Sequence, residues 1–498
     1  MTSFIRKVPT GSGATAVQIV HKRGRTVTGI EHIGSAHDQV ELEVLWEAAR
    51  QRLHAGQDML DLREATETGG PVVAGTRSRL LWQVLGDAYA RLGFDVLGDE
   101  AFREMVLARI IEPTSKADTI RVLSEIGIAP VSLRTLFRSL GRCQERDYRD
   151  RLSMAAAAHS ARTSGLAAMV MYDTTTLHFE VDEEDALRRV GRSKEHRVDP
   201  QVQVGLLVDP SGFPLEVHLF EGNTAETTSL IPVLTRFQQR HGVRGMVVVA
   251  DAGMLSASNL NALEDAGFWF IVGSRITKAP YDLADHFDRH GDHFADGQIL
   301  ESTRVMGIGA QARSRRIVYQ YSFKRRQRDD RAINAQIARA EKITTGKAPV
   351  TRTRFLKISG ADKQLDQTTI DRARQLAGLK GYVSNLPIQS MPADRLIGAY
   401  HDLWQVERSF RMTKSDLKAR PVFHHQRDAI EAHITVVFAA LAVARHLQDL
   451  TGISIKKLVR ILRPLREVDI TIRGQQLTAQ PALTDDARQI LDRLPPGD

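Results

Sequence analysis

The sequence predicts a multidomain protein of mixed α+β and α/β class, in which a mixed sheet with flanking helices is interrupted by a β-rich insertion. Three observations predict this class. The chain has 498 residues, more than one hydrophobic core usually supports. After a short strand-rich opening, apolar residues recur at helical spacing up to about residue 160, which predicts a mainly helical N-terminal region. Beyond it, short apolar runs separated by turn residues alternate with helical segments.

Six segments are expected in chain order. They are a basic β-hairpin region, a helical candidate DNA-binding domain, the first part of a core domain, a β-rich insertion, the second part of the core, and a C-terminal tail that is a candidate dimerisation segment. Their boundaries are 1–45, 46–160, 161–273, 274–392, 393–450 and 451–498.

Composition and charge narrow the function classes. The residues are 42% hydrophobic and 26% charged, as in folded proteins. The single cysteine, Cys143, excludes an intramolecular disulfide framework and a cysteine-rich zinc site, and we expect it to be buried. The N-terminus has no signal-like apolar core and no run approaches membrane-spanning length, so an intracellular protein is expected. The net charge of +8 favours a polyanionic partner.

The N-terminal third contains two candidate DNA-contacting features. A hairpin of residues 16–20 and 26–30 carries the basic tip His21–Arg25, which could enter a DNA groove or be an ordinary solvated turn. Farther on, Pro113–Ser115 is expected to cap a helix through Leu123. A turn over 126–132 then precedes three arginines at four-residue spacing, which fits either a helix-turn-helix reader or, slightly better, a helical bundle. These are Arg134, Arg138 and Arg142.

The core begins with an apolar strand, Met169–Tyr172, that leads directly into Asp173. A hairpin, a helix starting near Asn223 and Glu226, a second buried strand that leads into Asp251, and a further strand then follow. The hairpin strands, the second buried strand and the last strand are expected at 202–208, 215–220, 246–250 and 268–272. An antiparallel meander followed by parallel crossovers is the layout of the RNase H-like fold.

The insertion contains a strand with basic ends, Arg315–Arg326, which either faces DNA or is half-buried with solvated charges. A polar helix is expected over Arg331–Lys342, with more strands near Phe355 and Tyr382. In the second part of the core we expect two helices, which are one long amphipathic helix and one strongly apolar helix. They are Asp394–Leu417 and Ala429–Leu447.

Three carboxylates form the candidate site. Asp173 and Asp251 each end a buried strand, where ligands and metals commonly bind, although an aspartate here often only caps a turn. On the long helix, Tyr400, Glu407 and Lys414 recur at seven-residue spacing and so share one stripe. Leu403 and Phe410 lie between them and are expected to face the protein. An exposed Glu407, or its ion pair with Arg411, stays open as an alternative.

Together these residues resemble the DDE transposases of bacterial insertion sequences, in the branch with a Tyr-x2-Arg-x3-Glu-x6-Lys signature. Tyr400, Glu407 and Lys414 match in type and spacing, whereas Leu403 stands at the arginine position, so that contact must be absent or supplied by Arg408 or Arg411. Three other segments are similar to the family's motifs, and the resemblance covers roughly 165–445. The segments are Tyr172–Thr176, Gly222–Glu226 and Ala250–Met254.

The resemblance implies a transposase in which Asp173, Asp251 and Glu407 hold two Mg²⁺ ions, with Mn²⁺ as a substitute. It implies binding to the terminal inverted repeats of the element, strand cleavage and transfer into target DNA, and a homodimer on paired ends. We expect a bacterial cytoplasmic protein, associated with the nucleoid when bound, and no membrane partner. Trp404 is expected to be packed in the core rather than stacked on a base. The expected DNA-contacting residues are Tyr400, Lys414, Arg408, Arg411, Arg325 and Arg326.

Three other functions are weighed. A phosphatase with Asp173 as nucleophile would want a second acid where Thr175 stands. A catalytically inactive DNA-binding relic of a transposase is disfavoured because all three acids are present. A zinc site on His424, His425 and His433 is disfavoured because adjacent histidines point apart on a helix.

Overall fold

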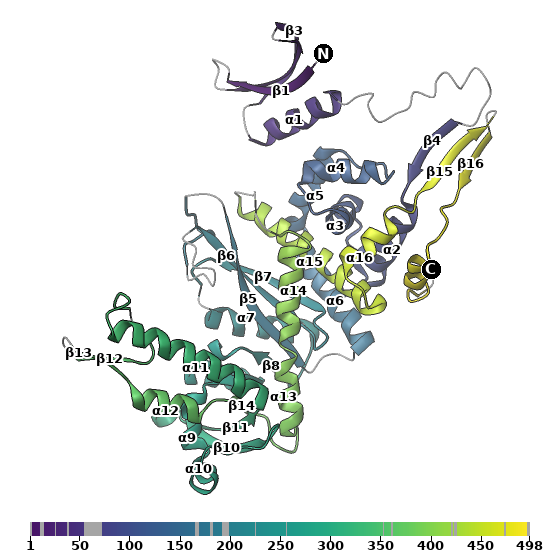
Figure 1. The fold of residues 1–498 in the computed structure, drawn as a ribbon. Coiled ribbons are helices and arrows are strands. Elements are labelled where there is room, and N and C mark those ends of the chain that lie inside the picture. The colour runs from purple at the N-terminus through teal and green to yellow at the C-terminus, as the bar shows by residue number, and fades with distance from the viewer. Residues whose placement is uncertain are drawn as a thin grey trace. The chain divides into compact units, whose positions relative to one another are not determined.

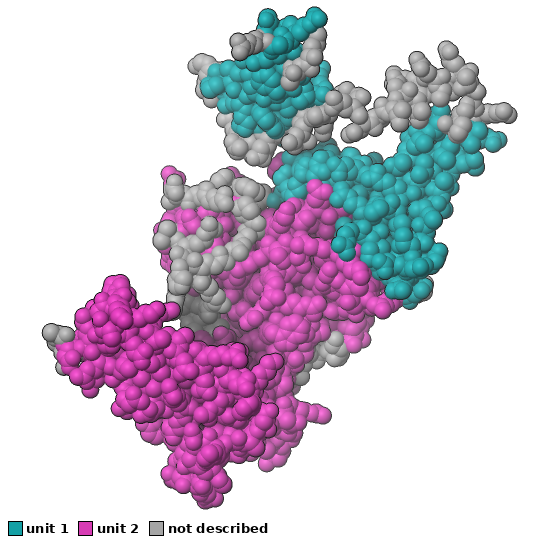
Figure 2. All heavy atoms as spheres, viewed as in Figure 1, with its two compact units in different colours: residues 1–83, 114–133, 459–492 teal, residues 84–113, 134–458, 493–498 magenta. Residues whose placement is uncertain are grey.

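The computed structural model describes most of the chain, in two compact units (Figure 2). One unit consists of residues 1–83, 114–133 and 459–492, and the other of 84–113, 134–458 and 493–498. The residues whose structure is described are 2–9, 14–24, 26–36, 39–53, 72–164, 169–179, 183–191, 199–224, 226–254, 256–351, 353–359, 362–419, 422, 426–472 and 475–495.

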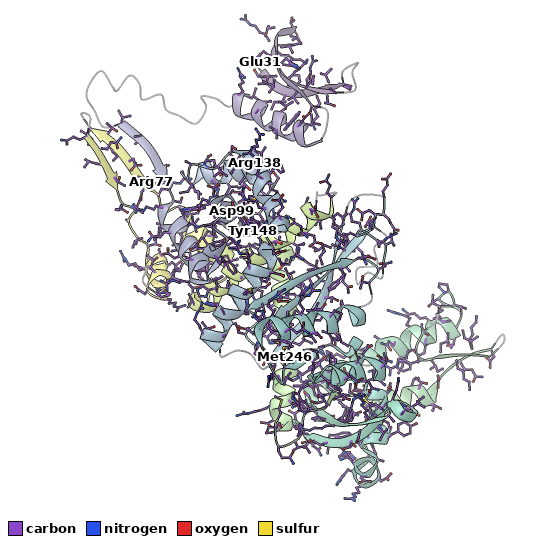
Figure 3. All side chains as sticks on the ribbon, turned by 180° about the vertical axis from the view of Figure 1, so that it is seen from behind. Glu31, Arg77, Asp99, Arg138, Tyr148 and Met246 are labelled. Carbon is purple, nitrogen blue, oxygen red and sulfur yellow. The ribbon has the colours of Figure 1, made fainter. Side chains whose placement is uncertain are left out.

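The first unit contains two small antiparallel sheets. Strands β1 (Thr2–Pro9), β2 (Thr15–Arg23) and β3 (Thr26–Ala36) pair in that order, and α1 (Gln39–Leu53) packs on them over Val17, Ile19 and Ala49. The predicted hairpin is therefore present, but with longer strands and a third partner. In Figure 3, Glu31 marks β3, where it pairs with Arg52 of α1 at 2.9 Å.

The C-terminal segment supplies the second sheet of this unit. Strand β15 (Glu467–Ile472) pairs with β16 (Gln475–Ala479) on one side and with β4 (Val72–Arg77) on the other. Arg77 of β4 donates to Asp469 of β15 at 2.9 Å. Residues nearly 400 positions apart in sequence are therefore joined, and the C-terminal segment is not a simple tail.

The second unit is built on an eight-stranded mixed sheet (Figure 1). Its strand order is β10-β11-β14-β9-β8-β5-β6-β7. Strands β5, β6 and β7 form an antiparallel meander, and β8 and β9 run parallel to β5, as the sequence predicts. The bounds of the strands are β5 Met169–His178, β6 Gln201–Val208, β7 Pro214–Glu221, β8 Val247–Ala250, β9 Trp269–Ser274, β10 Ile299–Met306, β11 Arg313–Tyr321 and β14 Leu379–Ser384.

The β6–β7 hairpin closes on a turn that the sequence encodes locally. Asp209 Oδ1 accepts hydrogen bonds from the backbone N–H groups of Ser211 (2.9 Å) and Phe213 (3.0 Å). Gly212 has φ +85°, a conformation that other residues rarely adopt. A Cβ at this glycine would lie 2.8 Å from the Cβ of Gln405, so the turn also packs closely against the helix that follows Leu403.

Helices cover the sheet and fill the rest of the second unit. Helix α14 contacts β5 and β6, and α15 contacts β7, so these two helices lie on the meander (Figure 1). The bounds of the remaining helices and short strands of the chain are α2 Arg79–Arg91, α3 Glu100–Ile111, α4 Lys116–Glu125, α5 Leu133–Glu145, α6 Tyr148–Ser164, α7 Glu226–His241, α8 Ala257–Asp265, α9 Ala279–Asp282, α10 Ala284–His290, α11 Phe323–Thr344, β12 Leu356–Ser359, β13 Asp362–Leu365, α12 Gln367–Gln375, α13 Ala393–His401, α14 Trp404–Ser415, α15 Arg427–Thr451, α16 Ile455–Leu462 and α17 Asp485–Leu491.

Helix α15 corrects one expectation. By its length and composition this helix could cross a membrane, and no other described helix meets both criteria. The sequence was expected to contain no apolar run approaching that length. Of its most apolar window, 94% is buried inside the structure. Its apolar side chains therefore pack against protein, which is the behaviour of a core helix.

The predicted β-rich insertion is a mixture of helices and strands that extends the main sheet. Strands β10, β11 and β14 continue the sheet beyond β9. Between β11 and β14, helices α11 and α12 and the β12–β13 hairpin pack around a small apolar core that includes Ile333, Phe355 and Ile370. The strand predicted over Arg315–Arg326 ends at Tyr321, because Ser322 caps α11 by accepting from the Arg325 N–H.

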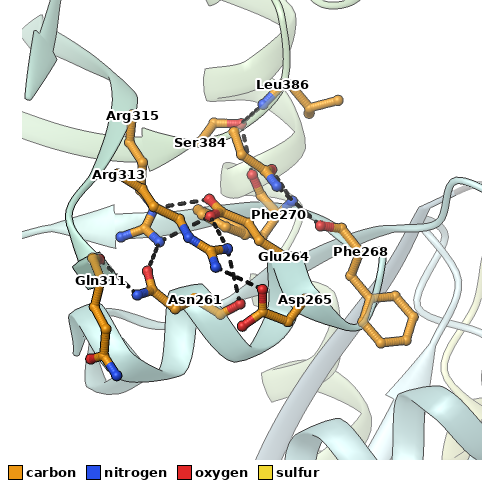
Figure 4. Close-up of polar contacts among 11 residues, drawn as sticks. Asn261, Glu264, Asp265, Phe268, Phe270, Gln311, Arg313, Arg315, Ser384 and Leu386 are labelled. Carbon is orange, nitrogen blue, oxygen red and sulfur yellow. Dashed lines mark hydrogen bonds and ion pairs between the residues drawn. The ribbon is translucent and has the colours of Figure 1, made fainter. Parts of the chain in front are cut away.

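Arg315 does not face solvent or DNA, because its side chain is fully buried. Its Nε donates to Glu264 of α8 at 2.9 Å, and its guanidinium also contacts Asn261 (Figure 4). Arg313 pairs with the same Glu264 and with Asp265. These contacts fasten β11 to the helix between β8 and β9, so the basic strand is structural at this end.

The three arginines at four-residue spacing after residue 133 also differ in their surroundings, some being structural and others exposed. Arg142 Nε donates to the buried carboxylate of Asp99 at 2.8 Å, and Ser139 (2.9 Å) and Tyr148 (2.7 Å) donate to the same oxygen. Figure 3 shows Asp99 beside Tyr148. Arg138 is exposed. Arg142 therefore joins α5 to the N-terminus of α3, as in a helical bundle, and does not extend an exposed row of arginines.

Candidate active site

Asp173 and Asp251 lie at the same level of two neighbouring strands. Asp251 directly follows β8, as predicted, but β5 continues past Asp173 to His178, so the expectation that Asp173 ends its strand is wrong. In the parallel pair β5–β8, Met169 pairs with Val247 and Met171 with Val249. Asp173 and Asp251 each lie two residues beyond the last of these pairs, so they continue the same register. Along β5, Tyr172 points to the opposite face, where its hydroxyl contacts Ser229 of α7 at 3.2 Å. Asp173 therefore faces the side of the sheet that α14 covers.

Asp251 is exposed and is held by two donors. Its Oδ1 accepts from the backbone N–H of Ala252 at 2.7 Å and from the Tyr400 hydroxyl at 3.1 Å. The hydroxyl reaches Asp251 across β9 at Gly273, where a Cβ would lie only 2.6 Å from it. Burial, and then the negative charge of Asp251, raise the pKa of Tyr400. Tyr400 is therefore a neutral hydrogen-bond donor to this carboxylate.

Glu407 shares a cleft with Asp173. The cleft has a volume of about 540 Å³ and is lined by residues of β5 and α14. Glu407 itself is exposed, as one of the alternatives from sequence allowed, while Leu403 and Phe410 are buried as predicted. The lining residues are Asp173, Thr174, Thr175, Glu407, Phe410, Arg411, Lys414 and Ser415.

The long helix predicted over Asp394–Leu417 is two helices. Helix α13 ends at His401, and two residues in tight turns precede α14. The Leu403 N–H donates to the Tyr400 carbonyl at 3.1 Å, a spacing of three residues rather than four. Tyr400 and Glu407 therefore lie on different helices, which places Tyr400 at Asp251 and Glu407 in the cleft beside Asp173.

Buried contacts hold the helix that carries Glu407. Ser409 Oγ donates to the Gly212 carbonyl of the β6–β7 turn at 2.9 Å. At the other end of α14, Arg109 of α3 donates to the carbonyl oxygens of Leu417 (2.8 Å) and Lys418 (3.3 Å). Burial lowers the pKa of Arg109 to about 10, so its guanidinium still carries a charge at neutral pH. It can thereby stabilise the negative end of the helix dipole.

The other predicted DNA-contacting residues do not share one location. Arg411 and Lys414 line the cleft with the acids. Arg408 instead stacks over Trp404 at 5.8 Å from the ring centroid. Trp404 is 50% exposed, so the expectation that it is packed in the core is wrong.

Arg325 and Arg326 lie in the first turns of α11, half-buried and near acidic residues one turn on. Arg325 is 3.6 Å from Asp329, and Arg326 is 3.5 Å from Asp330. Nothing in these contacts assigns either arginine to a ligand, and their DNA-binding role stays a prediction.

Sequence reasoning missed Lys380, at the start of β14. Its ammonium lies 4.4 Å from the centroid of the Tyr400 ring, and Tyr400 in turn donates to Asp251. The sequence did contain a signal for this residue. Lys380 is a charged residue within the strand-like segment 379–384, which begins directly after Gly378. A charged residue inside a buried strand usually has a specific reason to be there.

The donor set suits a hard divalent cation, although it is not a closed cage. In the described residues, no three His, Cys, Asp or Glu side chains are close enough to hold one ion together. Magnesium is commonly bound by one or two carboxylates, with substrate phosphate and water as the other ligands. Asp173 and Asp251 in adjacent register, with Glu407 beside Asp173, fit that pattern.

The zinc alternative rests on residues that are mostly undescribed. His424 and His425 lie outside the described residues, and the buried ring of His433 contacts the Ala419 carbonyl at 3.1 Å.

Comparison with known proteins identifies the family. No curated protein matches the chain. A solved structure with limited similarity is the "Cryo-EM structure of piggyBac transposase synaptic complex with hairpin DNA (SNHP)", at 10% identity and a TM-score of 0.37, covering 76% of this chain and 70% of that chain. The family model of the transposase DDE domain matches residues 158–443, which is more than half of the sequence, and this range contains Asp173, Asp251 and Glu407. The chain therefore belongs to the transposase DDE domain family.

Proposed function

We propose that this protein is an active transposase of a bacterial insertion sequence, in the branch with the Tyr-Arg-Glu-Lys signature and with an RNase H-like core. It would bind the terminal inverted repeats of its element, cut a DNA strand to leave a 3′-hydroxyl, and join that hydroxyl to a target phosphodiester. The observation that carries the proposal is the placement of Asp173 and Asp251 side by side at one sheet edge, with Glu407 facing Asp173 across a cleft.

Asp173, Asp251 and Glu407 would hold two divalent ions, Mg²⁺ or Mn²⁺. When bound, such ions supply activation of the attacking oxygen and stabilisation of the leaving oxygen. The protein's own part is to orient the carboxylates. Asp251 is oriented by Tyr400 and by its own turn, and Asp173 by its place within β5, which pairs with β8 on one side and β6 on the other.

Arg411 and Lys414 would bind backbone phosphates near the bond that is cut. Both line the cleft that contains Asp173 and Glu407, and both project from the helix that carries Glu407. Cations at this place offset the repulsion between the carboxylates and the DNA phosphates. Tyr400 would orient Asp251 more than contact DNA, because it is buried and its hydroxyl is already used.

We further propose a homodimer on paired DNA ends and a cytoplasmic location in a bacterium, associated with the nucleoid. Both follow from the proposed activity. The alternative is a catalytically inactive relic that still binds the terminal repeats.

Strand cleavage by the purified protein tests the proposal. The substrate is a duplex from the DNA that flanks its gene, and the wild type is compared with Glu407→Gln in magnesium, manganese and EDTA. We expect metal-dependent nicking at a defined end, lost in Glu407→Gln while DNA binding persists. Glu341→Gln, an exposed glutamate in the last turn of α11, is the matched control and should cut as wild type does.

The other outcomes separate the alternatives. Equal cutting by wild type and Glu407→Gln would remove Glu407 from the site and refute the assignment. Specific binding by all three proteins, with no cutting by any, would favour the inactive relic.

A further inference from the structure

The edge of the sheet that carries the acids also carries the start of β14. Strand β14 is antiparallel to β9, with Tyr382 opposite Gly273 and Gly381 opposite Ser274. In the parallel pair β8–β9, Ala250 lies opposite Val272, which puts Asp251 at the level of Gly273. An antiparallel strand begins at the edge where its neighbours end, so Lys380 lies at the same edge as Asp251.

Lys380 is held against the residue that orients Asp251. Its Nζ lies 4.4 Å from the ring centroid of Tyr400 and 5.7 Å from that of Tyr382, and the two rings pack edge to face at 5.0 Å. The lysine is half-buried, and within the described part of the chain it has no carboxylate within 4 Å. The aromatic faces stabilise the ammonium in part, but they do not neutralise it.

The N-terminus of α11 reaches the same edge. Strand β11 ends beside the start of β14, with Gln320 opposite Lys380, and the Ser322 N–H donates to the Gly378 carbonyl at 3.0 Å. Asp329 of α11 accepts from the Gly378 N–H at 3.1 Å, which ties the first turns of the helix to β14.

These turns add positive charge near Lys380. Burial lowers the pKa of Lys380, as do the charges of Arg325 and then Arg328, while Asp251 and Glu407 act in the opposite direction. Arg325 and Arg328 lie 3.6 Å and 4.0 Å from one carboxylate, that of Asp329. Three cations and one acid therefore leave this cluster with excess positive charge beside the acid site.

We propose that Lys380, with Arg325 and Arg328, binds backbone phosphates of the DNA strand that runs on from the bond being cut. The proposal rests on the proposed function. In the strand order, Asp173 on β5 lies on one side of Asp251 and Lys380 on β14 lies on the other. Arg411 and Lys414 line the cleft beside Asp173. The acids therefore lie between two groups of cations, this pair and the group around Lys380.

The dimensions suit a DNA strand. From β5 to β14 there are three strand spacings, or roughly 14 Å. That is about four base-pair steps along a duplex at 3.4 Å each. Phosphates on both sides of the cleaved bond can thus be bound at once, which would fix the bond over the acids.

The test compares Lys380→Gln and Lys380→Arg with wild type, with Lys342→Gln as the matched control. Lys342 is an exposed lysine near the end of α11, the helix that carries Arg325, and lies about 25 Å from Arg325 along that helix. Binding of a short duplex from the DNA flanking the gene is measured against salt concentration, with calcium in place of magnesium. Cleavage is measured in magnesium at saturating DNA, and thermal unfolding checks that each variant is folded.

We expect Lys380→Gln to lower the slope of log binding constant against log salt by about 0.9, the value for one lost phosphate contact. Its cleavage rate should fall roughly 100-fold, as for a misplaced substrate. Lys380→Arg should keep the wild-type slope, and Lys342→Gln should keep both slope and rate.

A folded Lys380→Gln with the wild-type slope and rate would overturn the proposal and leave Lys380 as a packing residue. If the wild type binds DNA but cuts none, the proposed function fails, and the salt slope still decides the role of Lys380. If the wild type binds no DNA, both proposals fail.

Discussion

Gly273→Ala is a small change that should disable the acid site through Tyr400. A Cβ at this position would lie 2.6 Å from the Tyr400 hydroxyl oxygen and 3.2 Å from the Cβ of Ala252. Non-bonded contacts of this kind are comfortable only at about 3.5 Å, so the hydroxyl must retreat by roughly 1 Å. The hydrogen bond from Tyr400 to Asp251, now 3.1 Å, would then be broken.

The expected loss is larger in activity than in stability. Overpacking by one methyl group costs about 1–3 kcal/mol of unfolding free energy. A displacement of about 1 Å at a reacting group can lower the rate roughly 100-fold. Because Asp251 is exposed and Tyr400 is its only side-chain donor among the described residues, we expect the larger effect on cleavage.

The assay is nicking of the flanking-DNA duplex, paired with urea unfolding of each variant. Gly398→Ala is the control, because this glycine lies in α13 and nothing lies within 4 Å of the added Cβ. That variant should cut normally and gain up to about 1 kcal/mol. When Tyr400 is already replaced by Phe, Gly273→Ala should lower the cleavage rate little further, because both changes remove the same hydrogen bond. Wild-type cutting by Gly273→Ala would refute this reasoning.

Two predictions concern stability alone. Burial by itself would raise the pKa of Glu216, but the hydrogen bond with His218, the nearby His241 ring at 3.7 Å and the charge of Arg240 lower it from 4.5 to about 2. Because the folded pKa is depressed, its contribution, on the order of 3 kcal/mol, is complete above about pH 4.5 and is lost as the pH falls toward 2. Urea unfolding at several pH values across that range should show the loss of unfolding free energy in the wild type and a weaker pH dependence in Glu216→Gln. An equal pH dependence in the two proteins would contradict the role of Glu216. Arg109→Met should cost about 1–3 kcal/mol, because it leaves the buried Leu417 carbonyl and the partly buried Lys418 carbonyl without this donor. Arg138→Met, at an exposed site, should change the unfolding free energy by less than about 0.5 kcal/mol, and a similar loss in both variants would count against the anchoring role of Arg109.

The central sheet could be predicted because its signals are local. Mainly apolar segments such as 202–208 mark strands buried on both faces, and Asp209 and Gly212 mark the turn between two of them. The strand pairing of the insertion could not be predicted in the same way. Which partner β11 takes depends on contacts such as Arg315 with Glu264, far apart in sequence, and an arginine in a strand looks equally suited to solvent.

The candidate site could be predicted where strand ends and helix spacing reveal it. Asp251 directly follows a parallel strand, and Asp173 lies inside β5 just beyond the point where its parallel pairing with β8 stops. The rule that ligands bind beyond the carboxyl ends of parallel strands needs no knowledge of the partners. Lys380 begins a strand, and it reaches the same edge only because β14 runs antiparallel to β9. Sequence alone does not give that direction. The break after His401 was hidden for a similar reason, since residues 402 and 403 keep helical composition while the hydrogen bonds tighten.

The placement of Glu407 depends on buried neighbours that have no chemical role of their own. Glu407 is exposed, whereas Val406, Ser409 and Phe410 on the same helix are buried. The helix is fixed at the β6–β7 turn by the Ser409 bond to Gly212, and at its other end by Arg109. Because the same meander carries Asp173, any shift of the helix along the sheet would move Glu407 relative to Asp173. The distance between two carboxylates is thus set by a glycine turn and a buried arginine, neither of which touches the cleft.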